Sequence, residues 1–138
     1  MMSSTMNIED QTVEIQAESD VAHAIFETQF ISQSMGFRKV DQAMIATAVS
    51  ELARNIFLHA GSGVISLRAI DEAGEQGIEV VAEDFGPGIK DIAQALGEGY
   101  STGGTLGLGL PGAKRLTDEF IFDSNRTVGT RIVVRKWL

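Results

Sequence analysis

The spacing of apolar residues predicts two long helices in the first half of the chain. The first is expected to begin with Asp20 as its N-cap and to end near Met35, before Gly36. The second is expected over residues 41–59, ending before Gly61. Apolar positions at helical spacing support both helices: Val21, Ala24, Ile25, Phe26 and Phe30 in the first, and Met44, Ile45, Ala48, Val49, Leu52 and Ile56 in the second.

Shorter apolar stretches predict five strands. They cover residues 12–16, 64–70, 77–84, 119–123 and 130–137, with a polar turn at 71–76 between the second and the third. Two short helices are expected around 91–96 and 108–117. Helices segregated from a mostly antiparallel sheet indicate an α+β fold, a two-layer α/β sandwich with the helices on one face.

The size of the chain fits one domain. At 138 residues it can form one sizeable core, so we expect a flexible N-terminus at 1–11 and a single domain at 12–138. The net charge of −8 argues against nucleic acid as a partner. There is no apolar run of membrane-spanning length, no signal-peptide pattern and no cysteine, which favours a cytoplasmic protein without a membrane contact.

Glycine is concentrated in one segment, where nine of the fifteen glycines lie between Gly86 and Gly112. Ordering glycine costs conformational entropy, so this density suggests close approach of the backbone to a ligand. An ordinary flexible loop is the alternative. A flexible loop does not explain why Asp84, Gly86 and Gly88 directly follow an apolar strand, whereas a ligand-binding segment does.

The end of the same segment is suited to phosphate. Gly107 and Gly109 come at the start of an expected helix, where unpaired N–H groups favour phosphate oxygens. Asp84, at a strand end, can accept a hydrogen bond from the amine of adenine. The hydroxyl-rich stretch 100–105 could close over such a ligand as a lid. The sequence contains neither a P-loop motif nor the motifs of a eukaryotic protein kinase.

Glu51 and Asn55 lie one turn apart on the second helix. An amide oxygen suits Mg²⁺, and a carboxylate can orient or deprotonate a hydroxyl. The alternative is a solvated helix face with an ion pair between Glu51 and Arg54. His59 is a weaker site candidate, since a histidine at a helix end also interacts favourably with the helix dipole.

Three segments in this order resemble the N, G1 and G2 boxes of the GHKL (Bergerat-fold) ATPases and kinases. They are Glu51-Leu52-Ala53-Arg54-Asn55, Asp84-Phe85-Gly86-Pro87-Gly88 and Gly104-Thr105-Leu106-Gly107-Leu108-Gly109-Leu110. The likeness covers almost the whole chain. Within the superfamily, the segments Gly99-Tyr100-Ser101-Thr102 and Gly109-Leu110-Pro111-Gly112 and the terminal Lys136-Trp137-Leu138 resemble the anti-sigma-factor-type serine/threonine kinases, in particular the RsbT-like switch kinases of the stressosome.

The resemblance implies a role for each matching residue. Glu51 would be the general base and Asn55 the Mg²⁺ ligand, while Asp84 would contact the adenine amine with support from Thr130. The remaining nucleotide-binding positions would be Gly86 and Gly88 at the base and Gly104, Gly107, Leu108 and Gly109 in the G2 box.

It also implies partners. Such kinases use Mg²⁺ and ATP to phosphorylate serine or threonine on STAS-domain antagonist proteins in partner-switching modules, and RsbT-like members also activate a PP2C-type phosphatase. Two alternatives stay open at this point: an anti-sigma factor, and a nucleotide-gated binding switch without kinase activity.

Overall fold

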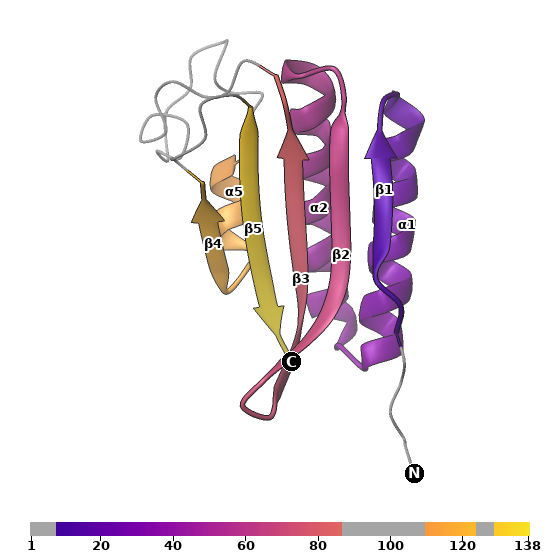
Figure 1. Cartoon of the computed structure of the whole chain (residues 1–138). Helices are drawn as coiled ribbons and strands as arrows, with labels where there is room; N and C mark the ends of the chain where they lie inside the picture. Colours follow the sequence, from indigo (N-terminus) through magenta and orange to yellow (C-terminus); the bar gives the residue numbers. More distant parts are fainter. Residues whose placement is uncertain (1–7, 87–109, 124–128) are drawn as a thin grey trace.

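The computed structural model describes residues 8–86, 110–123 and 129–138, which form a five-stranded sheet and three helices within these ranges (Figure 1). The elements in chain order are β1 (Gln11–Ile15), α1 (Glu18–Met35), α2 (Lys39–His59), β2 (Gly63–Glu72), β3 (Glu75–Asp84), α5 (Leu110–Arg115), β4 (Glu119–Phe122) and β5 (Thr130–Trp137). The helix expected at 91–96 lies outside the described residues, as does the start of the one expected at 108–117.

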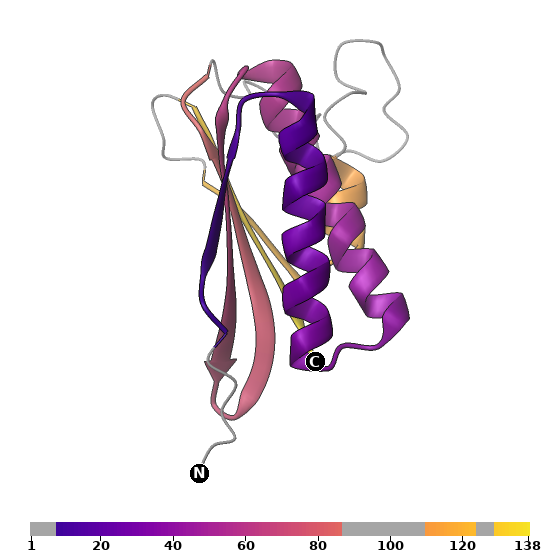
Figure 2. The ribbon, with the colours of Figure 1, turned by 90° about the vertical axis from the view of Figure 1, so that its right-hand side faces the viewer.

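The strands form one antiparallel sheet in the order β1-β2-β3-β5-β4. The three described helices lie on one face of this sheet, and α1 covers the β1 edge while α5 lies behind β4 and β5 (Figures 1 and 2). The predicted two-layer α+β fold is therefore confirmed.

The core lies between the sheet and the helices. Val13, Ile65, Ala82 and Ile132 form one continuous row across four paired strands, and each is almost fully buried. Strand side chains alternate between the two faces, so one face of every strand is apolar and packs against the helices. On α2 the buried positions include Ile45, Val49, Leu52 and Ile56, as the helical spacing predicts.

Three details of the helices and turns differ from the prediction. Asp20 is not the N-cap of α1: Ala17 occupies that position, and the Asp20 carboxylate accepts hydrogen bonds from the N–H groups of Gln16 and Ala17. A carboxylate in the first turn can thus cap the helix from inside it. The helix α2 begins two residues earlier than expected, and the β2–β3 turn contracts to Ala73 and Gly74.

Phe26 and Phe30 point away from the core. Their exposed fractions are 63% and 59%, although both belong to the apolar set that predicted α1. Core contacts of α1 come instead from residues such as Val21, Ala24 and Ile31. Within the described ranges, no helix is both long enough and apolar enough to cross a bilayer.

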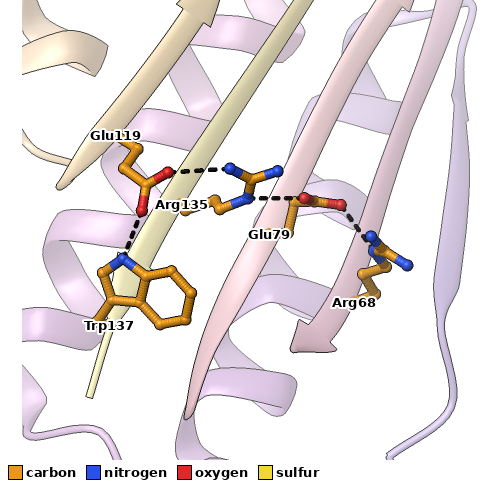
Figure 3. Close-up of polar contacts among 5 residues, drawn as sticks. All are labelled: Arg68, Glu79, Glu119, Arg135 and Trp137. Carbon is orange, nitrogen blue, oxygen red and sulfur yellow. Dashed lines mark hydrogen bonds and ion pairs between the residues drawn. The ribbon is translucent and has the colours of Figure 1, made fainter. Parts of the chain in front are cut away.

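The sheet face opposite the helices carries a row of alternating charges (Figure 3). Glu79 accepts hydrogen bonds from Arg68 at 2.7 Å and Arg135 at 2.8 Å, and Glu119 accepts from Arg135 at 2.9 Å and from the Trp137 indole at 2.7 Å. Burial opposes ionisation of Glu79, but the hydrogen bonds from the two arginines outweigh it and lower the pKa of this carboxyl group. The row therefore ties β2, β3, β5 and β4 together by charge-assisted hydrogen bonds.

Candidate active site

Glu51 and Asn55 occupy the C-terminal half of α2, one turn apart. Asn55 is buried, with 4% of its surface exposed, and Glu51 is half-buried. Arg54 is exposed, and in the part of the chain that the structure describes no ion pair joins it to Glu51. The interpretation of this helix face as a simple surface ion pair is therefore not supported.

Asn55 has an unusual environment. Among the described residues its Oδ1 atom is buried without a hydrogen-bond partner. An unpaired buried oxygen costs about 1–3 kcal/mol, so native proteins rarely retain one without a role. A neutral amide oxygen is also a suitable ligand for a hard cation such as Mg²⁺. The Asn55 Oδ1 atom is therefore suited to coordinate a metal ion that binds together with a ligand.

Asp84 ends β3 next to the start of β5. It is 5% exposed and lies directly opposite Thr130, which is equally buried. Asp84 Oδ1 accepts a hydrogen bond of 2.9 Å from the Gly86 N–H, which turns the chain as it leaves the strand. A buried carboxylate at a strand end, beside a buried hydroxyl, can recognise an amine such as that of adenine.

Two glycines let the backbone close around Asp84. A Cβ atom at Gly86 would lie 2.6 Å from the Cβ of Ala60, just after α2, so only glycine allows β3 and the end of α2 to approach this closely. Gly129 has a φ of 80° and packs against the backbone of Asp84 and Phe85, where a side chain would collide with the Asp84 carbonyl oxygen.

The C-terminal end of α2, the end of β3 and the start of β5 therefore lie at the same end of the domain (Figure 1). A Cβ atom at Gly63 would lie 2.7 Å from Ile56 Cγ2 and 3.0 Å from Asp84 Cβ, which shows that Ile56, next to Asn55, and Asp84 flank the same point. Three of the predicted site residues, Asp84, Gly86 and Thr130, are direct neighbours at this end of the domain. Asn55 lies in the part of α2 that approaches them, next to Ile56, and Glu51 lies one helical turn further from the end of the helix.

The other predicted nucleotide-binding residues lie outside the described residues: Gly88, Gly104, Gly107, Leu108 and Gly109, together with the expected lid at 100–105. His59 is exposed in the last turn of α2, as expected of a helix-end residue. In the described ranges no three His, Cys, Asp or Glu side chains cluster as a metal site would require.

The sequence did not single out Gly63 and Ala60 as parts of the site. Both support it by their small size, since Gly63 admits Ile56 and Asp84 and Ala60 admits Gly86. The available signal was weak: small residues that directly follow a long helix are common in turns and seldom mark a site.

Comparison with known proteins places the chain in a family. The family model described as a histidine kinase-like ATPase domain matches residues 13–136. The chain is 48% identical over 126 residues to the serine/threonine-protein kinase RsbT of Bacillus subtilis (strain 168), an alignment that covers 91% of this chain and 95% of that protein.

A second relative is the anti-sigma F factor of Clostridium novyi (strain NT). It is 32% identical over 101 residues, which cover 68% of this chain and 69% of the relative. The match to the ATPase model includes the three described helices and at least part of each of the five strands, and it covers every described residue of the candidate site. The chain belongs to the histidine kinase-like ATPase domain family and is a relative of RsbT.

Proposed function

We propose that this protein is a Mg-ATP-dependent serine/threonine protein kinase. One observation carries the proposal. The buried amide oxygen of Asn55, which has no hydrogen-bond partner among the described residues, lies one helical turn from the half-buried carboxylate of Glu51. A nucleotide pocket alone requires a cation ligand, whereas a transferase also requires a group that accepts the proton of the attacking hydroxyl. The 48% identity to a protein named as a serine/threonine kinase supports the same activity.

In the proposed reaction the hydroxyl oxygen of a substrate serine or threonine attacks the γ-phosphorus of ATP. The new O–P bond forms as the bond between the γ-phosphorus and the β–γ bridging oxygen breaks, and ADP leaves. Glu51 accepts the hydroxyl proton. Asn55 would hold Mg²⁺, which neutralises the phosphate oxygens when it is bound, and most of the rate would come from positioning and charge stabilisation.

The residues at the ends of β3 and β5 would select adenine as the base of the nucleotide. Asp84 would accept a hydrogen bond from the exocyclic amine of adenine, and Thr130 would support it from the neighbouring strand. Gly86 would keep this wall of the pocket free of side chains. The G1 and G2 box residues beyond Gly86, including Gly88, Gly104, Gly107, Leu108 and Gly109, complete the proposal.

The proposed substrate is a STAS-domain antagonist protein in a partner-switching module, and a PP2C-type phosphatase is the proposed second partner. Both follow from the resemblance to the RsbT-like switch kinases, and the identity to RsbT supports them. The proposal places the protein in the cytoplasm.

The test uses purified protein, labelled ATP, Mg²⁺ and the STAS-domain proteins encoded near this gene, with mapping of any modified residue. Glu51→Gln is expected to lower transfer by at least about 100-fold while ATP affinity stays within about threefold, since the base acts on the hydroxyl rather than on the nucleotide. Glu72→Gln, an exposed change at the end of β2, is the matched control. Full transfer by Glu51→Gln would remove the base role, and absence of transfer to every STAS protein by the wild type would overturn the substrate assignment.

A second candidate is an anti-sigma factor, favoured by the 32% identity to the anti-sigma F factor. The two functions differ in a direct binding property. Gel filtration with ATP and the sigma factors of the same cell would yield a stable complex only if the second candidate is correct.

A further inference from the structure

The part of α2 that carries Glu51 and Asn55 also has an exposed outer side. α2 lies between α1 and α5 and packs on the sheet through buried side chains such as Leu52 and Ile56 (Figure 1). On the opposite side of the helix Arg54 and Leu58 are exposed, Leu58 with 57% of its surface. The two residues are one turn apart and share a face, so a cation and a large apolar side chain lie next to each other.

Glu51 lies between this outer side and the buried Asn55. At 3.6 residues per turn, Asn55 is about 40° from Glu51 around the helix axis, while Arg54 and Leu58 are about 60° and about 20° away in the opposite direction. Asn55 is buried and Arg54 is exposed, so the first direction leads into the protein and the second toward solvent. Arg54 and Leu58 are therefore on the solvent side of the proposed base, and the proposed metal ligand is on the other side.

A substrate protein has to approach Glu51 from the solvent side. A base accepts a proton from a hydroxyl only at hydrogen-bond distance, so the segment that carries the hydroxyl must lie against the helix at Glu51. Along the helix axis Arg54 is about 4.5 Å and Leu58 about 10 Å from Glu51. A protein bound with its acceptor residue at Glu51 would therefore also cover Arg54 and Leu58.

Arg54 has a charge that such a protein can use. The chain has 19 acidic and only 11 basic residues, yet among the described residues no ion pair includes Arg54. A guanidinium group can bind a carboxylate through two parallel hydrogen bonds, and arginine is enriched among the residues that contribute most to protein interfaces. A carboxylate on the substrate therefore complements Arg54, and an apolar side chain complements Leu58.

We propose that Arg54 and Leu58 form the contact surface for the protein substrate. They bind an acidic and an apolar side chain that lie within about 10 Å of the acceptor hydroxyl on the surface of the substrate, a distance set by the rise of the helix between Glu51 and Leu58. The inference rests on the proposed kinase function, to which it adds the residues that recognise the substrate. Neither residue is expected to contact the nucleotide.

The first experiment compares steady-state phosphate transfer to a STAS-domain protein that the wild type phosphorylates. Arg54→Glu should raise the KM for this protein by about 10- to 100-fold, because an attraction becomes a repulsion. The kcat and the affinity for ATP should stay within about threefold of the wild type, since the contact is made to the substrate protein alone. Lys39→Glu, the same charge change at the exposed start of α2, is the control and should leave this KM unchanged.

Leu58→Gln should raise the same KM by about 5- to 10-fold, as the loss of one apolar contact would. Val40→Gln is its matched control, because Val40 is 56% exposed and belongs to the same helix. A melting curve followed by circular dichroism checks that each variant is folded. Replacing the acidic residue nearest to the mapped phosphorylation site of the substrate by arginine should restore transfer by Arg54→Glu and impair transfer by the wild type.

The second experiment detects the contact without relying on transfer. The chain contains no cysteine, so Leu58→Cys and Val40→Cys can each be labelled at one position with a benzophenone maleimide. Illumination with the same STAS-domain protein and a non-hydrolysable ATP analogue should cross-link the label at position 58 to the substrate. The label at position 40 should not cross-link.

The outcomes separate this inference from the kinase function itself. Transfer by Arg54→Glu with an unchanged KM for the substrate would overturn the inference and leave the kinase function intact. Weaker ATP binding or a lower kcat with an unchanged KM would also overturn it, because Arg54 would then act on the nucleotide. A wild type that phosphorylates no STAS-domain protein would overturn the proposed substrate and this inference with it.

Discussion

Asp84 and Thr130 lie directly opposite each other on β3 and β5, and both are 95% buried from solvent. Asp84 is at once the last residue of its strand and the acceptor of the Gly86 N–H, so the carboxylate is fixed on two sides. The strand pairing therefore fixes the position of the Asp84 carboxylate, the proposed acceptor for adenine, without a bound nucleotide.

Asp84→Asn should weaken ATP binding by about 10- to 100-fold, because a hydrogen bond to a charged group contributes about 1.5–3 kcal/mol. The amide oxygen can still accept the Gly86 N–H, so the fold should be retained. Calorimetric titration with ATP measures the change, and Asp71→Asn, at the far end of the β2–β3 hairpin, is the control. Unchanged affinity would take Asp84 out of the adenine site.

Asn55→Leu should separate stability from function. The substitution removes a buried oxygen that has no partner among the described residues, so the free energy of unfolding without nucleotide should stay the same or rise by about 1 kcal/mol. Binding of Mg-ATP should be lost. Urea unfolding and calorimetric titration measure the two quantities, and a variant that binds Mg-ATP normally would exclude Asn55 as the metal ligand.

Glu79→Gln should destabilise the fold by about 1–3 kcal/mol near pH 7, a range that allows for the solvent exposure of Arg68. The pKa of Glu79 is lowered in the folded protein, so its ionised form contributes stability above the ordinary value of 4.5, and this contribution is lost as the pH falls through the folded-state value. The difference between wild type and variant should therefore shrink below pH 4.5.

Urea unfolding at several pH values tests this pattern. Glu75→Gln, an exposed change on the same strand, should show neither the loss at pH 7 nor its pH dependence. An equal loss at every pH would mean that Glu79 acts by packing rather than by charge.

Ala73→Asn should raise the free energy of unfolding by about 0.5–1 kcal/mol. Ala73 has a φ of 55° and precedes Gly74 with a φ of 86°, so the β2–β3 hairpin turns through two left-handed residues. Asparagine tolerates this conformation better than alanine does, while Ala73→Val should destabilise because a β-branched residue resists it. Thermal unfolding of the wild type and the two variants measures these differences. A valine variant as stable as the asparagine variant would contradict this account.

The sequence alone predicted most of the secondary structure and identified the candidate site residues. Apolar periodicity placed α1, α2 and all five strands to within a few residues, since helices and strands depend on interactions close along the chain. The order of the three boxes pointed to the ATPase family, and the family match confirmed it. The polar residues Glu51 and Asn55 beside the apolar face of the second helix were visible as well.

Tertiary structure decided what depends on contacts between distant residues. The strand order, with β5 between β3 and β4, places Thr130 beside Asp84 and aligns Arg68, Glu79, Arg135 and Glu119 in one row. No local pattern encodes such a register, because the paired residues Glu79 and Arg135 lie 56 positions apart in the chain. Packing also turned Phe26 and Phe30 outward, since the buried face of α1 is chosen by what the sheet and α2 can cover and not by hydrophobicity alone.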